Sequence, residues 1–385
     1  MGTSEIRALA DEYFEYLSET GPTEAHLRGD YRYADRFEDM SRAAEDADVA
    51  ALRGFVARAQ LIDPTDLSHE DTLTREVLIF EAETKAALGE LHMAEFAVDP
   101  IFGIQVEATI LPPMFSVPTA DVADAMVGKY RGYGRAVDQL TDRYLEGVAS
   151  GRVPPAFAVE DVITQLDEWL VLPIDQDPLL NTQVPDNFTE DQIAAYRSAL
   201  ATAVRDVVRP AIERQRDVLR DEVRPVARPE GQEGLRWLAD GDLVYDRSIH
   251  RYTTLPMQAR EIHEIGLQQI ARLAEEYRAI GAEALGTTDL PEIFSRLRDD
   301  PDLHHTTGEG VRAAAETAFD KARAAMGDWF GRLPESDCVV EETPSGAQAF
   351  YFQAAEDGSR PGMFFMNTAD PTSWGTFEVE ATAFH

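Results

Sequence analysis

Histidine offers the most chemistry in this chain, and its 8 copies lie in different contexts. His263 lies in a helical segment, but its neighbours four residues away are Ala259 and Leu267, so no second metal ligand shares its face. A structural role is therefore favoured for His263. Two further candidates are interpreted as surface or loop side chains: the pair Asp246 and His250, one helical turn apart, and His304-His305. No G-x-S-x-G elbow or phosphate-binding loop accompanies them.

The final histidine, His385, ends a segment whose helical spacing places Phe377, Phe384 and His385 along one side. A zinc peptidase needs a histidine, an adjacent glutamate as general base and a second histidine one turn later. The sequence supplies the first of these three members. From the residues alone, the interpretation of His385 is a frayed terminal side chain.

The elements that must position this histidine include a short sheet. Before the final helix the period of the apolar residues changes from 3.6 to 2, at three runs: Cys338–Glu341, Ala349–Phe352 and Met363–Met366. These runs predict a small antiparallel β-sheet of two or three strands directly before the C-terminal helix.

Helical periodicity dominates the rest of the chain and predicts a mainly α fold. Pro210 lies inside a long helical pattern and predicts a kink or two helices there. We expect an N-terminal helical region at 1–228 and a C-terminal region at 229–385, joined as one continuous fold. A helix in the second region is expected to bury an apolar stripe made of Ile262, Ile265, Leu267, Ile270, Leu273 and Tyr277.

The composition limits the function classes. The net charge of −36 gives a surface that repels phosphate backbones, so we expect no binding to nucleic acid. No apolar run is long enough to span a membrane, and the N-terminus lacks the basic and apolar regions of a signal peptide. The single cysteine, Cys338, fits a reducing compartment, so the predicted location is the cytoplasm.

The C-terminal stretch resembles a known family. DGSRPGMFFMNT followed by FEVEATAFH is similar to the bacterial domain-of-unknown-function family 885. In these gluzincin-like proteins a strand ending in Asn-Thr leads to a helix reading A-x-x-x-H-E-A-x-P-G-H-H. GLRWLADGDLVYDRSIHRYTTL and REIHEIGLQQIARLAEE resemble the central segment of the same family. The resemblance covers essentially the whole chain and is most specific from Gly234 to His385.

The resemblance implies a large neurolysin-like helical fold and a zinc-dependent, metallopeptidase-like hydrolase that acts on peptides or amide-linked small molecules. It makes His385 the first zinc ligand, with Glu378 and Glu380 as surface or supporting groups. It also implies an edge strand beside the cleft, against which an extended peptide could add as a further strand. The substrate-binding candidates are Arg360, Met363, Phe364, Phe365, Met366 and Asn367. For Arg360 and Asn367 a turn-forming role is equally open.

The sequence lacks the general-base glutamate, the second histidine and the later glutamate ligand of this motif. One imidazole cannot hold zinc tightly, so we expect a truncated, catalytically inert form without stably bound zinc. The missing helices would pack on Phe377, Phe384 and the helices around Leu267, which predicts an exposed apolar surface open to self-association or a partner. Two alternatives stay open: a non-enzymatic helical binding module that uses Met363–Met366, and a site completed by a second polypeptide.

Overall fold

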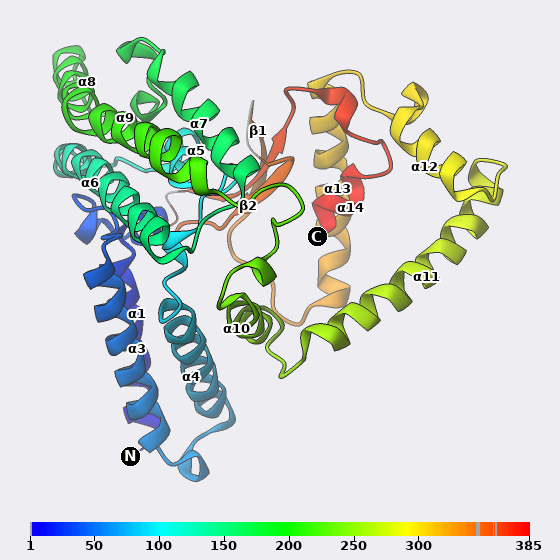
Figure 1. The fold of residues 1–385 in the computed structure, drawn as a ribbon, viewed down its shortest axis with the longest axis horizontal. Helices are drawn as coiled ribbons and strands as arrows, with labels where there is room; N and C mark the ends of the chain where they lie inside the picture. The colour runs from blue at the N-terminus through cyan, green and yellow to red at the C-terminus, as the bar shows by residue number, and fades with distance from the viewer. Residues whose placement is uncertain (1, 344–346, 357, 359) are drawn as a thin grey trace. The chain divides into compact units, whose positions relative to one another are not determined.

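The computed structural model of the chain describes residues 2–343, 347–356, 358 and 360–385. Its elements are mainly helical, with one small sheet late in the chain (Figure 1), which confirms the predicted fold class. The chain divides into two compact units, Met1–Gln258 and Ala259–His385. This division lies further along the chain than the expected boundary at residue 228.

The segment around Arg228 is packed, which explains why unit 1 continues past it. Arg228 is buried, and its Nε donates to the carbonyl oxygen of Val153 at 2.9 Å. Its Nη1 donates to three carbonyl oxygens of the following turn, those of Gln232, Glu233 and Gly234. The guanidinium thus ties this turn to the loop before α7 (Ala156–Leu170).

The helices of unit 1 follow one another through short loops and 3-10 turns. In chain order they are α1 (Gly2–Thr20), α2 (Pro22–Leu27), α3 (Arg42–Leu61), α4 (His69–Gly89), α5 (Ile104–Ile110), α6 (Ala120–Ser150), α7 (Ala156–Leu170), α8 (Glu190–Ala203), α9 (Arg209–Val218) and α10 (Gly241–Thr253).

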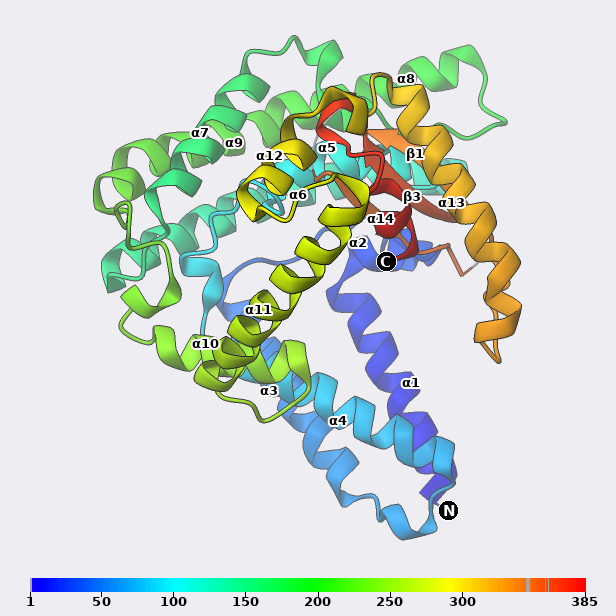
Figure 2. The same ribbon diagram turned by 90° about the vertical axis from the view of Figure 1, so that its right-hand side faces the viewer.

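The helices α3 and α4 form a hairpin, and α1 packs against it (Figure 2). Both helices of the hairpin begin at a serine N-cap, since the hydroxyl of Ser41 accepts from the amide of Ala44 and that of Ser68 from the amide of Asp71. Each cap satisfies an amide that the first turn leaves free. The core between the three helices is apolar and includes Ile6, Leu9, Tyr13, Leu52, Phe55, Leu78, Ala82 and Ala86.

The long helix α6 is the centre of the remainder of unit 1 and packs against α8 and α9. A π-helical turn, Val204–Val208, lies between α8 and α9 and directly precedes Pro210. Proline has no amide hydrogen, so the regular hydrogen-bond ladder is interrupted and the wider turn accommodates the interruption. The predicted break at Pro210 is confirmed. A Cβ on Gly134 of α6 would lie 3.1 Å from the carbonyl oxygen of Val207, so glycine permits this close approach.

Unit 2 contains helices on either side of a three-stranded sheet in sequence. Its elements are α11 (Ala259–Ala284), α12 (Leu290–Asp299), α13 (Gly308–Trp329), β1 (Cys338–Thr343), β2 (Ala349–Phe352), β3 (Gly362–Asn367) and α14 (Val379–Phe384).

The sheet is mixed rather than wholly antiparallel. Its strand order is β1-β3-β2, so β3 lies between the other two. β3 pairs with β1 in parallel, from Cys338 opposite Gly362 onward, and with β2 antiparallel, with Phe350 opposite Phe365. The expected antiparallel pairing therefore holds only for β2 and β3. Strand periodicity specifies which residues alternate between faces, but not the direction in which a strand enters the sheet.

One face of this sheet is buried against α13 and α14 (Figure 1). Trp374 is 1% exposed at the centre of that core, and its Nε1 donates to the carbonyl oxygen of Asn367 at 2.8 Å. This bond satisfies the polar end of a buried indole. The other members of the cluster are apolar: Val311, Ala315, Val340, Phe364, Met366 and Val379.

The helix α11 is the exception to this packing. Within unit 2 its main contact is with α12, through Tyr277 and Phe294, whose ring centroids lie 5.1 Å apart, and through buried Gly281. The prediction that α11 buries its apolar stripe is wrong, because Ile270 is 66% exposed and Leu267 is 49% exposed. A helical period identifies a face that needs a partner, but it does not show that this chain supplies the partner.

Candidate functional site

The six substrate-binding candidates lie in or beside β3, the central strand of the sheet. The prediction that β3 is an edge strand is wrong, because both of its sides are already paired. An extended peptide can add only to a strand with a free side, so β3 cannot receive one. Phe364 and Met366 are 7% and 0% exposed and face the helices. Two of the residues predicted to form a contact surface on β3 are therefore buried and cannot contact a ligand.

Met363 and Phe365 project to the opposite face of the sheet, because successive side chains of a strand alternate. On that face Phe365 stacks on Phe350 with a centroid distance of 4.8 Å and an interplanar angle of 17°. Phe352 meets Phe365 edge-on at 6.2 Å. The result is a half-buried aromatic cluster, and it is the part of β3 that remains available for contact.

Arg360 and Asn367 shape the two ends of β3. Arg360 is 7% exposed, and its backbone oxygen accepts from the amide of Ala355 at 2.9 Å. The side-chain oxygen of Asn367 accepts from the amide of Ala369 at 3.1 Å, so this residue forms the turn that follows the strand. The structural role left open for both residues is thus visible. Their contact with a substrate stays a prediction.

His385 follows the short helix α14 and is exposed. Val379 anchors α14 in the core of unit 2, and the amide of His385 donates to the carbonyl oxygen of Ala381 at 3.2 Å. Nearby Phe377 and Phe384 are 44% and 52% exposed, so both side chains lie at the surface, as expected.

The two glutamates before the histidine have structural partners. The side chain of Glu378 accepts from the amide of Gly375 at 3.1 Å, which closes the turn into α14. The carboxylate of Glu380 accepts a hydrogen bond from the ammonium of Lys321 at 2.5 Å, which links α14 to α13 at the surface. These contacts agree with their interpretation as supporting or surface groups.

These residues do not fit a zinc centre by themselves. Within the part of the chain that the structure describes, no group of three or more histidine, cysteine, aspartate or glutamate side chains is placed to hold a metal ion. A zinc site needs three or four protein ligands, and His385 has no such company here. No catalytic step through a metal can be derived from this arrangement.

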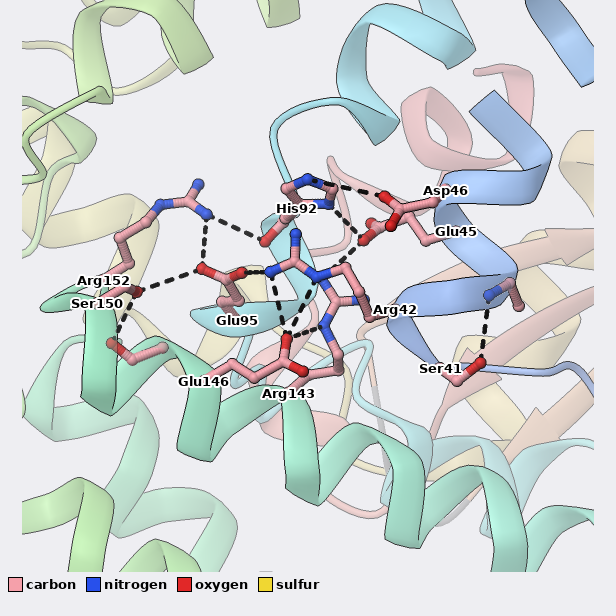
Figure 3. Close-up of polar contacts among 12 residues, drawn as sticks. Ser41, Arg42, Glu45, Asp46, His92, Glu95, Arg143, Glu146, Ser150 and Arg152 are labelled. Carbon is pink, nitrogen blue, oxygen red and sulfur yellow. Dashed lines mark hydrogen bonds and ion pairs between the residues drawn. The ribbon is translucent and has the colours of Figure 1, made fainter. Parts of the chain in front are cut away.

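Unit 1 contains a network of ionisable groups that no sequence pattern predicts (Figure 3). Its centre is Glu95, which is 4% exposed and lies in the turn after α4. Arg42 from α3 and Arg152 from the loop after α6 both pair with this carboxylate, Arg152 at 2.8 Å. A Cβ on Gly147 would lie 2.3 Å from the carbonyl oxygen of Glu95, so only glycine lets the turn approach α6 this closely.

The same network continues to a second carboxylate. Buried Arg143 of α6 donates to Glu45 of α3 at 2.7 Å and also pairs with Glu146 at 3.1 Å. His92 contacts Glu45 at 2.9 Å from a left-handed backbone position with φ 47° (Figure 3). The charges alternate and are mutually paired, as in a structural network. No spacing in the sequence connects these positions, because three separate segments contribute them.

A small pocket in unit 1 contains the most perturbed carboxyl. Glu107 of α5 lines it together with aromatic side chains and Lys129. Burial raises the pKa of Glu107 to about 7, with smaller contributions from Glu38 and Glu24. Burial also lowers the pKa of Lys129 to about 8, and its ammonium donates to the carbonyl oxygen of Arg36 at 2.8 Å. The ammonium of Lys129 thus already occupies the polar part of this pocket.

Comparison with known families now places the chain. A family model described as bacterial protein of unknown function (DUF885) matches residues 22–385. The chain belongs to the DUF885 family. The family-level resemblance inferred from the C-terminal stretch is thereby confirmed, whereas the metallopeptidase relationship stays a prediction. No curated protein shows significant similarity to the chain.

Two solved structures share the fold of this DUF885 chain. A proposed lipoprotein from Colwellia psychrerythraea matches with a TM-score of 0.86 at 18% identity, over 99% of this chain and 70% of that one. A proposed lipoprotein of unknown function from Shewanella oneidensis matches with a TM-score of 0.61 at 14% identity, over 98% and 67% of the two chains. At such identities the likeness shows the fold alone. Among the described residues of the DUF885 chain, each helix is too short or too polar to cross a bilayer.

Proposed function

We propose that this DUF885 chain is part of a zinc-dependent hydrolase of peptide or amide bonds, and that it is inactive by itself. The observation that supports the proposal is the position of His385. The chain runs from β3 through a turn into α14, and the exposed histidine follows that helix. This order of strand, turn, helix and histidine is the one in which the resemblance assigns the first zinc ligand.

The missing ligands are central to the proposal. The described residues place no other metal ligands around His385 in a group of three or more. Tight zinc binding therefore requires residues from further polypeptide, either joined to this chain or supplied by a second one. Zinc is proposed for that completed assembly.

The aromatic cluster on the open face of the sheet is the proposed substrate contact. Of the six candidates, Met363 and Phe365 point to this face, whereas Phe364 and Met366 are covered by helices. Apolar and aromatic side chains bind the side chains of peptides by excluding water. Arg360 and Asn367 are then assigned to positioning β3.

Metal analysis of the purified chain tests this proposal. The zinc content after dialysis, measured by mass spectrometry, is expected to lie far below one ion per chain. Hydrolysis of a mixed peptide library should stay at the level of a buffer blank, with or without a chelator. A His385→Ala variant should lower the weak zinc uptake at high zinc more than a matched His263→Ala variant, because His385 is the proposed ligand and His263 is not.

One zinc per chain, together with hydrolysis that a chelator abolishes, would overturn the claim that the isolated chain is inert. Equal zinc uptake by wild type and both variants would overturn the role of His385. The mass of the purified assembly decides between a lone chain and one completed by a second polypeptide.

The proposed location is the cytoplasm, on the basis of the single cysteine. The two solved relatives are described as proposed lipoproteins, and that description does not support a cytoplasmic location for those two proteins. Fractionation of cells that produce the chain decides the matter, and recovery with the membrane fraction would contradict the proposal.

A further inference from the structure

The helix α11 presents a long apolar stripe that α12 contacts at Tyr277 and that unit 2 otherwise leaves exposed. At 100° per residue, Ile262, Leu273 and Ile280 fall within about 20° of one line, and Ile265, Ile270 and Tyr277 flank it. The exposed fractions of Ile270 and Ile280 are 66% and 64%, and that of Leu273 is 42%. We call these six residues the α11 stripe. A stripe of this width normally faces a core.

Outside the α11 stripe the side chains of α11 are mainly polar or small, with exposed Leu267 as the exception. Gln268 and Glu275 lie there, about 120° and about 140° from the line through Ile262 and Ile280. The pair Arg272 and Glu276, one turn apart at 3.6 Å, lies along one border of the stripe. An amphipathic helix of 26 residues with a single apolar face is the form that docks against another helix.

The length of the solved relatives indicates what fills this surface. The Colwellia protein shares the fold over 99% of this chain, yet this chain covers only 70% of it. The Shewanella protein shows the same relation, with 67% covered. Both relatives therefore contain polypeptide beyond the region that they share with this chain. We expect that additional polypeptide to pack on apolar surface that the shared region leaves exposed.

A second copy of this chain is a poorer occupant. Each chain has a net charge of −36, so two copies repel one another at the distance of an interface. Like charges along the borders of the stripe would also meet in one of the two possible orientations of a symmetric helix pair.

We propose that the α11 stripe is the docking surface for an amphipathic helix from the polypeptide that relatives of this fold contain beyond the region shared with this chain. The helix would place aliphatic side chains on Ile270, Leu273 and Tyr277, in a helix-to-helix contact. This interaction is independent of the proposed hydrolase activity, since it requires neither zinc nor substrate.

Co-expression tests the proposal. The 385-residue chain is produced together with a tagged polypeptide that comprises the unmatched part of the Colwellia protein, and in a second experiment with that of the Shewanella protein. We expect a 1:1 complex with at least one of them. Leu273→Asp, which places a charge in the α11 stripe, should weaken the complex at least about tenfold. The matched control Gln268→Asp, which adds the same charge on the polar side, should leave the affinity unchanged.

Hydrogen exchange of α11 provides the second measurement. The amides of α11 should exchange more slowly in the complex than in the isolated chain, whereas those of α3 should not change. Circular dichroism of both variants checks that they fold, which is expected because Leu273 and Gln268 lie at the surface.

Three results would overturn the proposal. Failure of both unmatched polypeptides to bind is the first. A dimer of the chain alone that Leu273→Asp dissociates would assign the surface to a second copy. Strong protection of α11 in the monomeric chain would show that the chain covers the stripe itself.

Discussion

At the residue scale, Glu107 is a carboxyl whose pKa depends on where the chain places it. Burial raises its pKa to about 7 from an ordinary value of 4.5. The folded state therefore holds the proton more tightly than the unfolded state. The resulting stability is fully present below pH 4.5 and is lost as the pH rises through 7.

Glu107→Gln should therefore stabilise the protein at pH 8, by roughly 1–3 kcal/mol, and have little effect on stability at pH 4. Urea unfolding at both pH values measures the difference. Asp124→Asn, a change at an exposed carboxylate of α6, is the control and should show no such pH dependence. A Glu107→Gln variant that is equally stable or less stable at pH 8 would show that the carboxylate is satisfied in the fold.

The ion network around Glu95 contains the second prediction at this scale. Glu95→Gln removes a buried negative charge from between Arg42 and Arg152. Breaking one partner of a buried pair leaves the other charge uncompensated, so the free energy of unfolding should fall by about 3 kcal/mol.

The matched control for this change is Glu90→Gln. Glu90 also pairs with two arginines, Arg53 at 2.7 Å and Arg247 at 3.0 Å, but it is 37% exposed. Solvent screening limits its loss to less than about 1 kcal/mol. Denaturant unfolding at pH 7 compares the variants, and equal losses would contradict the structural role of burial in this network.

At the scale of elements, successive side chains of β3 point to opposite faces of the sheet. Met366 is 0% exposed against α13 and α14, while Met363 lies half-buried on the other face. Met366→Ala should reduce stability by about 2–5 kcal/mol, because it leaves a cavity in a core that cannot collapse fully. Met363→Ala should cost less than about half of that.

Thermal unfolding followed by far-ultraviolet circular dichroism measures this difference. Equal losses for the two methionine variants would mean that the open face of the sheet is packed as tightly as the covered one. That result would also remove Met363 and Phe365 as the proposed substrate contacts.

At the scale of the whole molecule, the net charge of −36 opposes folding. The 71 acidic residues repel one another, and only 35 basic residues offset this repulsion. Salt shortens the range of this repulsion from about 10 Å at 0.1 M to about 3 Å at 1 M. Raising KCl between these concentrations should raise the melting temperature by about 5 °C. NaCl at equal ionic strength is the control and should act alike. A fall in melting temperature would show that exposed ion pairs outweigh the repulsion.

Much of the fold follows from local patterns. Apolar residues at helical spacing identify the helices, serine and threonine caps mark their starts at Ser68, Thr119 and Thr189, and Pro210 marks the break before α9. Each of these features depends on residues a few positions apart, so it can be predicted from a short segment of the sequence. Local pattern also predicted the three strands, whereas the role of His385 comes from the family resemblance and stays a prediction.

The remaining features depend on contacts between distant segments, and only the tertiary structure decided them. The insertion of β3 between β1 and β2 turned a predicted edge into a central strand. Glu95 pairs with arginines from two distant segments, α3 and the loop after α6, and α11 has an exposed apolar face. Pairing direction, long-range ion pairs and the partner of an apolar face are not encoded in periodicity, because periodicity describes one segment at a time.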